Sequence, residues 1–240
     1  MNPMPWSDQT PDSRSPDWQR ALQEAPPAEA ERLLRAAAQS LLQWQLDGAA
    51  LALPPFDEAA LRRELQLFVD ACVVGEHQRQ WTETQQRWWA HCCQVLARNH
   101  AEQPRLPMLA DAIDAAAPRL QGPLGYELAA LLRGPALAFE EEQELDAAIR
   151  YWEQARKAQL PVDADFGEFW RRLELSGLQR HLALLGAACR EGQRGQAPAD
   201  DPRPRLFAYA IKVSTRYIEL SPLTQLLQDL QGGLVQTAFR

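Results

Sequence analysis

The sequence predicts a predominantly all-α fold, and two observations lead to this prediction. Apolar residues recur every three or four positions through most of the chain after residue 29, which is the spacing of amphipathic helices. Sustained alternation of β-branched and aromatic residues, which is typical of strands, does not occur. Because 46% of the 240 residues are hydrophobic, the chain can fill a genuine core. We therefore expect a helical domain over residues 29–240, preceded by a proline-rich, poorly ordered arm at residues 1–28.

The first half of this domain contains three predicted helices and one irregular stretch. The apolar spacing predicts a helix from residue 30 to residue 42, and the sequence LPPFD at residues 53–57 ends that element. Asp57 is placed to cap a second helix, whose buried face would contain Leu61, Leu65, Phe68 and Cys72. A third helix is expected over residues 83–97. Residues 99–121 carry prolines at positions 104, 107 and 118, which predicts a loop with at most one helical turn.

The second half of the domain is predicted to hold five helices. The first two are expected over residues 126–132 and 144–158, and Pro161 stops the second of them. Asp165 is placed to cap a long helix that runs through Leu185. The polar, proline-bearing segment 191–204 separates that helix from a last pair, expected over residues 206–219 and 222–230.

Charge and hydropathy exclude several classes of protein. The formal net charge is −7 and the sequence pI is about 5.2, with no dense cluster of Lys and Arg, so we expect no nucleic-acid partner. Residues 1–16 show no basic region followed by an apolar run, and no stretch approaches the roughly 18 apolar residues that a membrane span requires. We therefore expect a cytoplasmic protein without a membrane partner.

Motifs that identify common metal sites and enzyme classes are missing. The cysteines at positions 72, 92, 93 and 189 show no CxxC spacing, so we expect reduced thiols. Cys92 and Cys93 fit an apolar helix face better than a redox or metal role. Neither GxGxxG nor GxxxxGK[ST] occurs, and GxSxG and HExxH are also absent. Glu140, Glu141 and Glu142 could hold a cation, but acidic residues at a helix start normally remain solvated there.

Several separate motifs closely resemble one family of small-molecule kinases. They read LPPFD at 53–57, GPLGYELAALLR at 122–133, IRYWEQARK at 149–157, LPVDADF at 160–166, GLQRHL at 177–182 and RYIELSPL at 216–223. In this order, over residues 30–230, they resemble the C-terminal lobe of the anomeric N-acetylmuramate and N-acetylglucosamine kinases. That family falls within the aminoglycoside phosphotransferase and choline kinase-like superfamily. In it the second motif usually reads GPxxYDLxSLLRD and directly follows the metal-binding segment. The resemblance implies the helical C-lobe of a kinase-like phosphotransferase.

Two departures from the family pattern bear on activity. The family's β-rich N-terminal lobe, which carries the nucleotide-binding lysine, has no counterpart, because the residues before Leu53 fit an arm and a helix. The family's catalytic loop is His-x-Asp followed five residues later by Asn. Its closest remnant here is His100-Ala101-Glu102, with Pro107 where Asn should stand. Phosphoryl transfer needs a carboxylate that accepts the hydroxyl proton and Asp and Asn groups that hold Mg²⁺, and proline offers no side-chain oxygen.

The resemblance also implies candidate site residues. The candidate catalytic residues are Asp111, Asp114 and Glu102. Asp114 is also the candidate metal ligand, since Ile113-Asp114 resembles the start of the family's metal-binding segment, although a capping or solvated Asp is the simpler interpretation. The candidate substrate-binding residues are Gln179, Arg180 and His181. His181 also lies on the apolar stripe of its helix, where a core histidine is the simpler interpretation.

Three hypotheses for the function follow. The first is a degenerate, pseudokinase-like phosphotransferase that needs no cofactor and acts as a binding or scaffolding module in peptidoglycan recycling. Its protein partner or a second copy would cover the face that the N-lobe leaves bare. The alternative is an active or residual kinase that uses ATP and Mg²⁺ on an amino-sugar ligand. It would use Asp111, Asp114 or Glu102 in unorthodox roles, or an N-lobe from another chain. The third is a decayed paralogue without activity.

Overall fold

The computed structural model describes residues 20–22, 24–109, 119–134, 139–196 and 201–237. Its named helices are α2 (Pro27–Gly48), α3 (Glu58–Leu67), the π-helix η1 (Phe68–Glu76), α4 (Glu83–Glu102), α5 (Leu124–Leu132), α6 (Glu141–Lys157), α7 (Phe166–Gln193), α8 (Arg203–Arg216), the 3₁₀-helix η2 (Ile218–Leu220) and α9 (Ser221–Thr237). In these ranges the strands are β1 (Arg105–Leu109) and β2 (Arg119–Pro123), which form one two-stranded sheet. The prediction of a predominantly all-α fold is confirmed.

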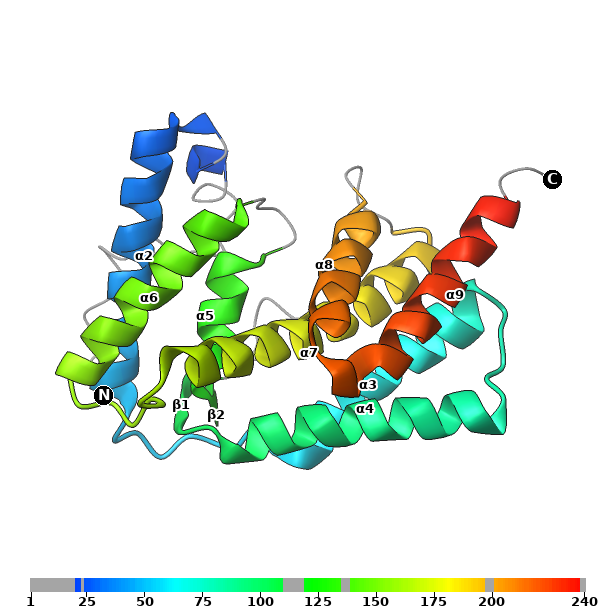
Figure 1. The fold of residues 1–240 in the computed structure, drawn as a ribbon, viewed down its shortest axis with the longest axis horizontal. Helices are drawn as coiled ribbons and strands as arrows, with labels where there is room; N and C mark the ends of the chain where they lie inside the picture. The colour runs from blue at the N-terminus through cyan, green and yellow to red at the C-terminus, as the bar shows by residue number, and fades with distance from the viewer. Residues whose placement is uncertain (1–19, 23, 110–118, 135–138, 197–200, 238–240) are drawn as a thin grey trace.

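Helix α7 crosses the middle of the molecule and is shared by two hydrophobic cores (Figure 1). Its first turns, with Phe169 and Leu173, pack into a core built with α2, α5 and α6. Its later turns, with Leu182 and Leu185, pack into a second core built with α3, η1, α4, α8 and α9. Helix α7 therefore fixes the positions of the two hydrophobic cores relative to each other.

In the second core, Gly186 of α7 lies very close to the backbone of the neighbouring helix. A Cβ atom at this position would lie 2.6 Å from the backbone nitrogen of Phe68 and 2.7 Å from the carbonyl carbon of Leu67. These atoms mark the junction where α3 becomes η1. Only a glycine lets α7 pack directly against the neighbouring backbone there.

The predicted capping residues begin their helices. The Asp57 carboxylate accepts a hydrogen bond from Ala60 N–H at 2.8 Å, and Asp165 accepts one from Glu168 N–H at 3.0 Å. The buried face predicted after Asp57 is also confirmed, since Leu61, Leu65, Phe68 and Cys72 are all buried, although the helix changes to π geometry at Phe68. Four helices run further than predicted: α2 extends to residue 48, α4 to residue 102, α7 to residue 193 and α9 to residue 237.

The prediction that residues 99–121 form a loop is wrong at both ends. Residues 105–109 and 119–123 pair as antiparallel strands, with Pro107 opposite Gln121. The N–H of Gln121 donates to Pro54 O at 2.8 Å, and its carbonyl accepts from Phe56 N–H at 2.9 Å. Because Gln121 directs its backbone groups toward LPPFD and away from β1, the missing N–H of Pro107 removes no bond from the ladder.

Some expectations fall partly or wholly outside the described residues. Most of the predicted arm, namely residues 1–19 and residue 23, is outside them, and helix α2 begins at Pro27. The segment 110–118, which contains Asp111 and Asp114, is also outside them. A search of the described helices for one long and apolar enough to span a bilayer finds none.

Candidate functional site

The candidate site residues lie in separate parts of the structure. Glu102 is the last residue of α4, and its side chain is 53% exposed. Asp111 and Asp114 lie outside the described residues. The candidate substrate-binding residues are buried in α7: Gln179, Arg180 and His181. The structure therefore does not bring the buried trio to Glu102.

Within the described residues, no group of three or more His, Cys, Asp or Glu side chains is placed to hold a metal ion. Those residues do not fit a magnesium site by themselves, and no metal-dependent step is assigned to them. The acidic run at the start of α6 has a structural explanation. Glu140 caps the helix, while Glu141 pairs with Lys212 at 3.1 Å and with Arg216 at 2.6 Å.

Cys92 and Cys93 lie on the buried side of α4, which confirms the apolar-face interpretation. Burial raises the pKa of Cys92 to about 11 and that of Cys93 to about 12. Both groups are therefore neutral thiols near pH 7, and they serve the packing of α4.

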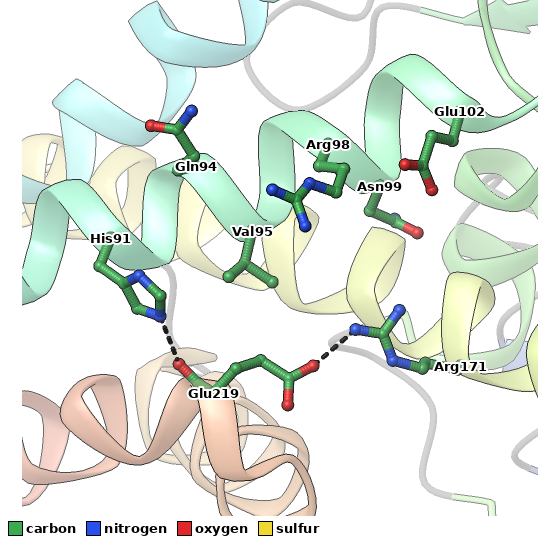
Figure 2. A pocket seen from close by; sticks show the side chains of 8 residues that line it. All are labelled: His91, Gln94, Val95, Arg98, Asn99, Glu102, Arg171 and Glu219. Carbon is green, nitrogen blue, oxygen red and sulfur yellow. Dashed lines mark hydrogen bonds and ion pairs between the residues drawn. The ribbon is translucent and has the colours of Figure 1, made fainter.

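A pocket lined by several polar side chains lies between the other side of α4, the first turns of α7 and η2 (Figure 2). Its volume is about 290 Å³, and its lining residues are His91, Gln94, Val95, Arg98, Asn99, Glu102, Arg171 and Glu219. Six of these eight come from α4, where they recur at short helical intervals. The same periodicity that buries one side of α4 thus presents the opposite side to the pocket.

Contacts between three elements brace one end of the pocket. The imidazole Nε2 of His91 lies 3.1 Å from the carbonyl oxygen of Glu219, so α4 is tied to η2. The guanidinium of Arg171 donates to the Glu219 carboxylate at 2.5 Å, so η2 is tied to α7 (Figure 2). Burial raises the pKa of Glu219, but the hydrogen bond and charge of Arg171, a backbone hydrogen bond and the charge of His91 together outweigh burial and hold that pKa below its ordinary value. The carboxylate therefore stays ionised and keeps this end in place.

The other end of the pocket contains a carboxylate in an ion-pair chain. Glu102 Oε2 lies 3.3 Å from the guanidinium of Arg172, which also donates to Asp163 at 3.0 Å. Asn99 lies beside this chain, and its amide donates to Arg172 O at 3.2 Å and to Ser176 Oγ at 3.4 Å. Arg172 therefore orients Glu102, while the half-exposed carboxylate remains open to a ligand.

A second charged cluster, which we call the buried network, lies where α5, α6, α7 and α8 meet. Arg133 donates to Glu144 at 2.9 Å and to Glu174 at 3.2 Å, and these side chains are almost fully buried. Arg216 pairs with Glu174 at 2.5 Å, and the Tyr217 hydroxyl donates to the same carboxylate. Burial raises the pKa of Glu144, against the opposing effect of Arg133. Each member pairs with at least one other member, although Arg133 Nη1 and Glu144 Oε1 have no hydrogen-bond partner in the described structure, and we interpret the buried network as structural.

His181 supports the buried network. Its Nε2 lies 2.9 Å from the carbonyl oxygen of Arg133, and its ring stacks on Tyr209 with centroids 4.8 Å apart. Burial lowers the pKa of His181 to about 3, so the ring is neutral at pH 7 and Nε2 donates to that carbonyl. This geometry favours the core-histidine interpretation. A substrate role for Gln179, Arg180 and His181 stays a prediction.

Most of the residues that line the pocket could not be identified from the sequence. Arg98, Arg171 and His91 were not among the candidate residues, and Glu219 appeared only inside a motif. One available signal was the polar spacing of residues 91, 94, 98 and 102 along the third predicted helix. Nothing in the sequence pairs that helix with Arg171 or Glu219, because tertiary packing brings them together. The assembled pocket offers donors and acceptors suited to a small hydroxyl-rich ligand.

Comparison with known proteins gives three curated relatives, each named N-acetylmuramate/N-acetylglucosamine kinase. The relative from Neisseria meningitidis is 35% identical over 229 residues, which is 88% of this chain and 67% of the relative. Those from Pseudomonas aeruginosa and Pseudomonas putida are 32% and 31% identical, and the matches cover 65% and 64% of their lengths. The chain thus spans about two thirds of the length of the curated relatives it matches. No family model matches the chain.

These names overturn the hypothesis of a degenerate, pseudokinase-like scaffold and favour its kinase alternative. The mistaken hypothesis depended on two absences, that of the β-rich N-terminal lobe and that of the spacing His-x-Asp followed by Asn. A carboxylate that accepts a proton is defined by its position beside the substrate, not by that spacing. Glu102 lines the pocket, and Asp111 and Asp114 lie between β1 and β2 in the chain.

Proposed function

Because the chain belongs to the N-acetylmuramate/N-acetylglucosamine kinase family, we propose that it acts in the ATP-dependent phosphorylation of an amino sugar. The observation that carries this proposal is the 35% identity over 229 residues to a protein named as such a kinase. The proposed substrates are N-acetylmuramate and N-acetylglucosamine. A protein partner and a place in peptidoglycan recycling stay predictions.

In the proposed reaction, a sugar hydroxyl attacks the γ-phosphorus of ATP and ADP leaves. The hydroxyl proton must pass to a base, and in kinases a carboxylate accepts it. Glu102 is the described residue best suited to this role, since it lines the pocket and Arg172 orients it from 3.3 Å. Asp111 and Asp114 are the competing candidates for the base, and Asp114 remains the candidate metal ligand.

The test is release of ADP by the intact chain with ATP, Mg²⁺ and each of the two sugars, measured by a coupled assay. We expect turnover with an N-acetylated amino sugar and none with glucose. The variant Glu102→Gln keeps the size of the side chain but removes the base, so we expect turnover to fall about 10²- to 10⁴-fold.

Three further variants complete the design. Asp111→Asn and Asp114→Asn test the competing carboxylates under the same conditions. Glu58→Gln is the matched control, because Glu58 is an exposed residue of α3 that pairs with Arg62 at 2.6 Å and does not line the pocket. If neither sugar leads to release of ADP, the proposed function is contradicted. Full activity of Glu102→Gln would instead show that another residue, such as Asp111 or Asp114, is the base.

A further inference from the structure

Arg98 differs from the other arginines near the pocket. Arg171 is paired with Glu219, and Arg172 is paired with Glu102 and Asp163. Arg98 is exposed and lines the pocket, yet it has no hydrogen-bond or ion-pair partner among the described residues. It therefore presents a permanent positive charge and several N–H donors to whatever enters the pocket.

Asn99, the next residue, has a buried side-chain acceptor without a hydrogen-bond partner in the described structure. Its side chain lines the pocket and the residue is only 5% exposed, because it is wedged between α4 and α7 (Figure 2). Its amide group has two partners on α7, whereas Oδ1 has no hydrogen-bond partner in the described structure. A buried acceptor without a partner is unfavourable, but because Oδ1 is itself buried, a ligand in the pocket does not reach it without a movement of the side chain.

Size and charge together limit the class of ligand. A volume of about 290 Å³ is at the lower end for small-molecule sites, which suits a ligand of the size of a monosaccharide derivative. Arg98 and Glu102 are four residues apart on α4, or about 6 Å along the helix axis. A pyranose ring with a carboxylate substituent can therefore reach both, with its anion toward Arg98 and a hydroxyl toward Glu102.

N-acetylmuramate and N-acetylglucosamine differ in whether the sugar ring carries a carboxylate substituent. N-acetylmuramate carries a lactyl ether that ends in a carboxylate, and N-acetylglucosamine has a free hydroxyl instead. Building on the proposed function, we propose that the pocket between α4, α7 and η2 binds the sugar. In it, Arg98 receives the lactyl carboxylate and determines the preference for N-acetylmuramate. Arginine suits this role because its planar guanidinium matches a carboxylate with two parallel hydrogen bonds.

The test is the binding of each sugar to the intact chain, measured by calorimetry without ATP. In Arg98→Gln we expect the dissociation constant for N-acetylmuramate to rise about 10- to 100-fold, as expected for loss of a charge-assisted pair. The constant for N-acetylglucosamine should change less than twofold. Arg98→Lys keeps the positive charge but not the planar guanidinium with its two parallel donors, so it should recover part of the lost affinity for N-acetylmuramate.

A matched control is Arg63→Gln, since Arg63 is an exposed arginine of α3 that does not line the pocket. It should bind both sugars as the wild type does. The melting temperature of each variant, measured without ligand, shows that the comparison is made between folded proteins.

Each outcome either supports or overturns the inference. Equal weakening of both sugars, no change in Arg98→Gln, or no binding of N-acetylmuramate to the wild type would overturn it. Selective loss of N-acetylmuramate would support it, even if the chain releases no ADP, since binding is measured without turnover. Phosphorylation of both sugars with an unchanged preference in Arg98→Gln would leave the proposed function standing and remove this inference alone.

Discussion

Arg133 in the buried network and Arg98 in the pocket are the same residue type in opposite settings. The Arg133 side chain is 2% exposed and is held by Glu144 and Glu174, whereas Arg98 is exposed and has no partner among the described residues. Arg133 ends the motif GPLGYELAALLR, which carries much of the family resemblance, but Arg98 lies in none of the quoted motifs. The comparison teaches that a motif can mark the residues that hold a fold together while ligand-binding residues lie elsewhere.

The strongest test of the buried network is Arg133→Met. This change leaves the buried carboxylate of Glu144 without its guanidinium, whereas Glu174 keeps its pair with Arg216, so we expect the free energy of unfolding to fall by about 3–5 kcal/mol. Urea denaturation followed by circular dichroism measures it. The matched control is Arg62→Met, which removes an exposed pair with Glu58 and should cost less than about 1 kcal/mol. Equal losses in the two variants would show that the network is not structural.

The next largest expected loss of stability comes from a substitution in helix α7. Gly186→Ala places a methyl group against the backbone of residues 67 and 68, and we expect a loss of about 1–3 kcal/mol from overpacking. In Gly192→Ala, later in the same helix, the new methyl group lies 3.7 Å from its nearest neighbour outside the helix backbone, Arg203 Nη1, so the change should be neutral or slightly stabilising. Thermal unfolding of the pair measures the difference. A stable Gly186→Ala protein would mean that α7 and η1 can separate without cost.

Acid should weaken the buried network through His181. Burial lowers its pKa from 6.5 to about 3, so between these values the unfolded chain binds more protons than the folded chain. The stability contributed by the neutral ring is therefore present above pH 6.5 and is lost as the pH falls, by up to about 1.4 kcal/mol per pH unit. His100, with a pKa lowered to about 4 by burial and by the charge of Arg105, acts in the same direction.

The measurement is urea denaturation at pH 7, 6 and 5 of wild type and His181→Asn. We expect a shallower fall of stability in the variant. Glu144, whose raised pKa acts in the opposite direction, contributes to both proteins and cancels in the difference. Identical pH slopes would show that His181 titrates normally in the folded protein.

The smallest expected change in stability is at the two pocket residues Arg98 and Glu102. Arg98→Gln and Glu102→Gln should change the free energy of unfolding by less than about 0.5 kcal/mol, because both side chains are exposed and neither holds the core together. Urea denaturation followed by circular dichroism, as for Arg133→Met, measures this change in the free energy of unfolding. A loss comparable to that of Arg133→Met would make these residues structural and would weaken their assignment to ligand binding.

Local signals explain how much of this could be predicted from sequence. Asp57 and Asp165 cap helices as expected, because capping depends on a side chain and a backbone amide only three residues away. Strand β1 was missed because five residues with a central proline give no alternating pattern, and its pairing depends on contacts with β2. The pocket was missed for the same reason, since it is assembled from residues 91–102, 171 and 219.

The most direct test of the central claim is a crystal structure of the chain with N-acetylmuramate bound. We expect the sugar between α4, α7 and η2, with its carboxylate about 3 Å from the Arg98 guanidinium and a hydroxyl within hydrogen-bonding distance of Glu102. Sugar bound at another place, with this pocket filled by water alone, would contradict the account.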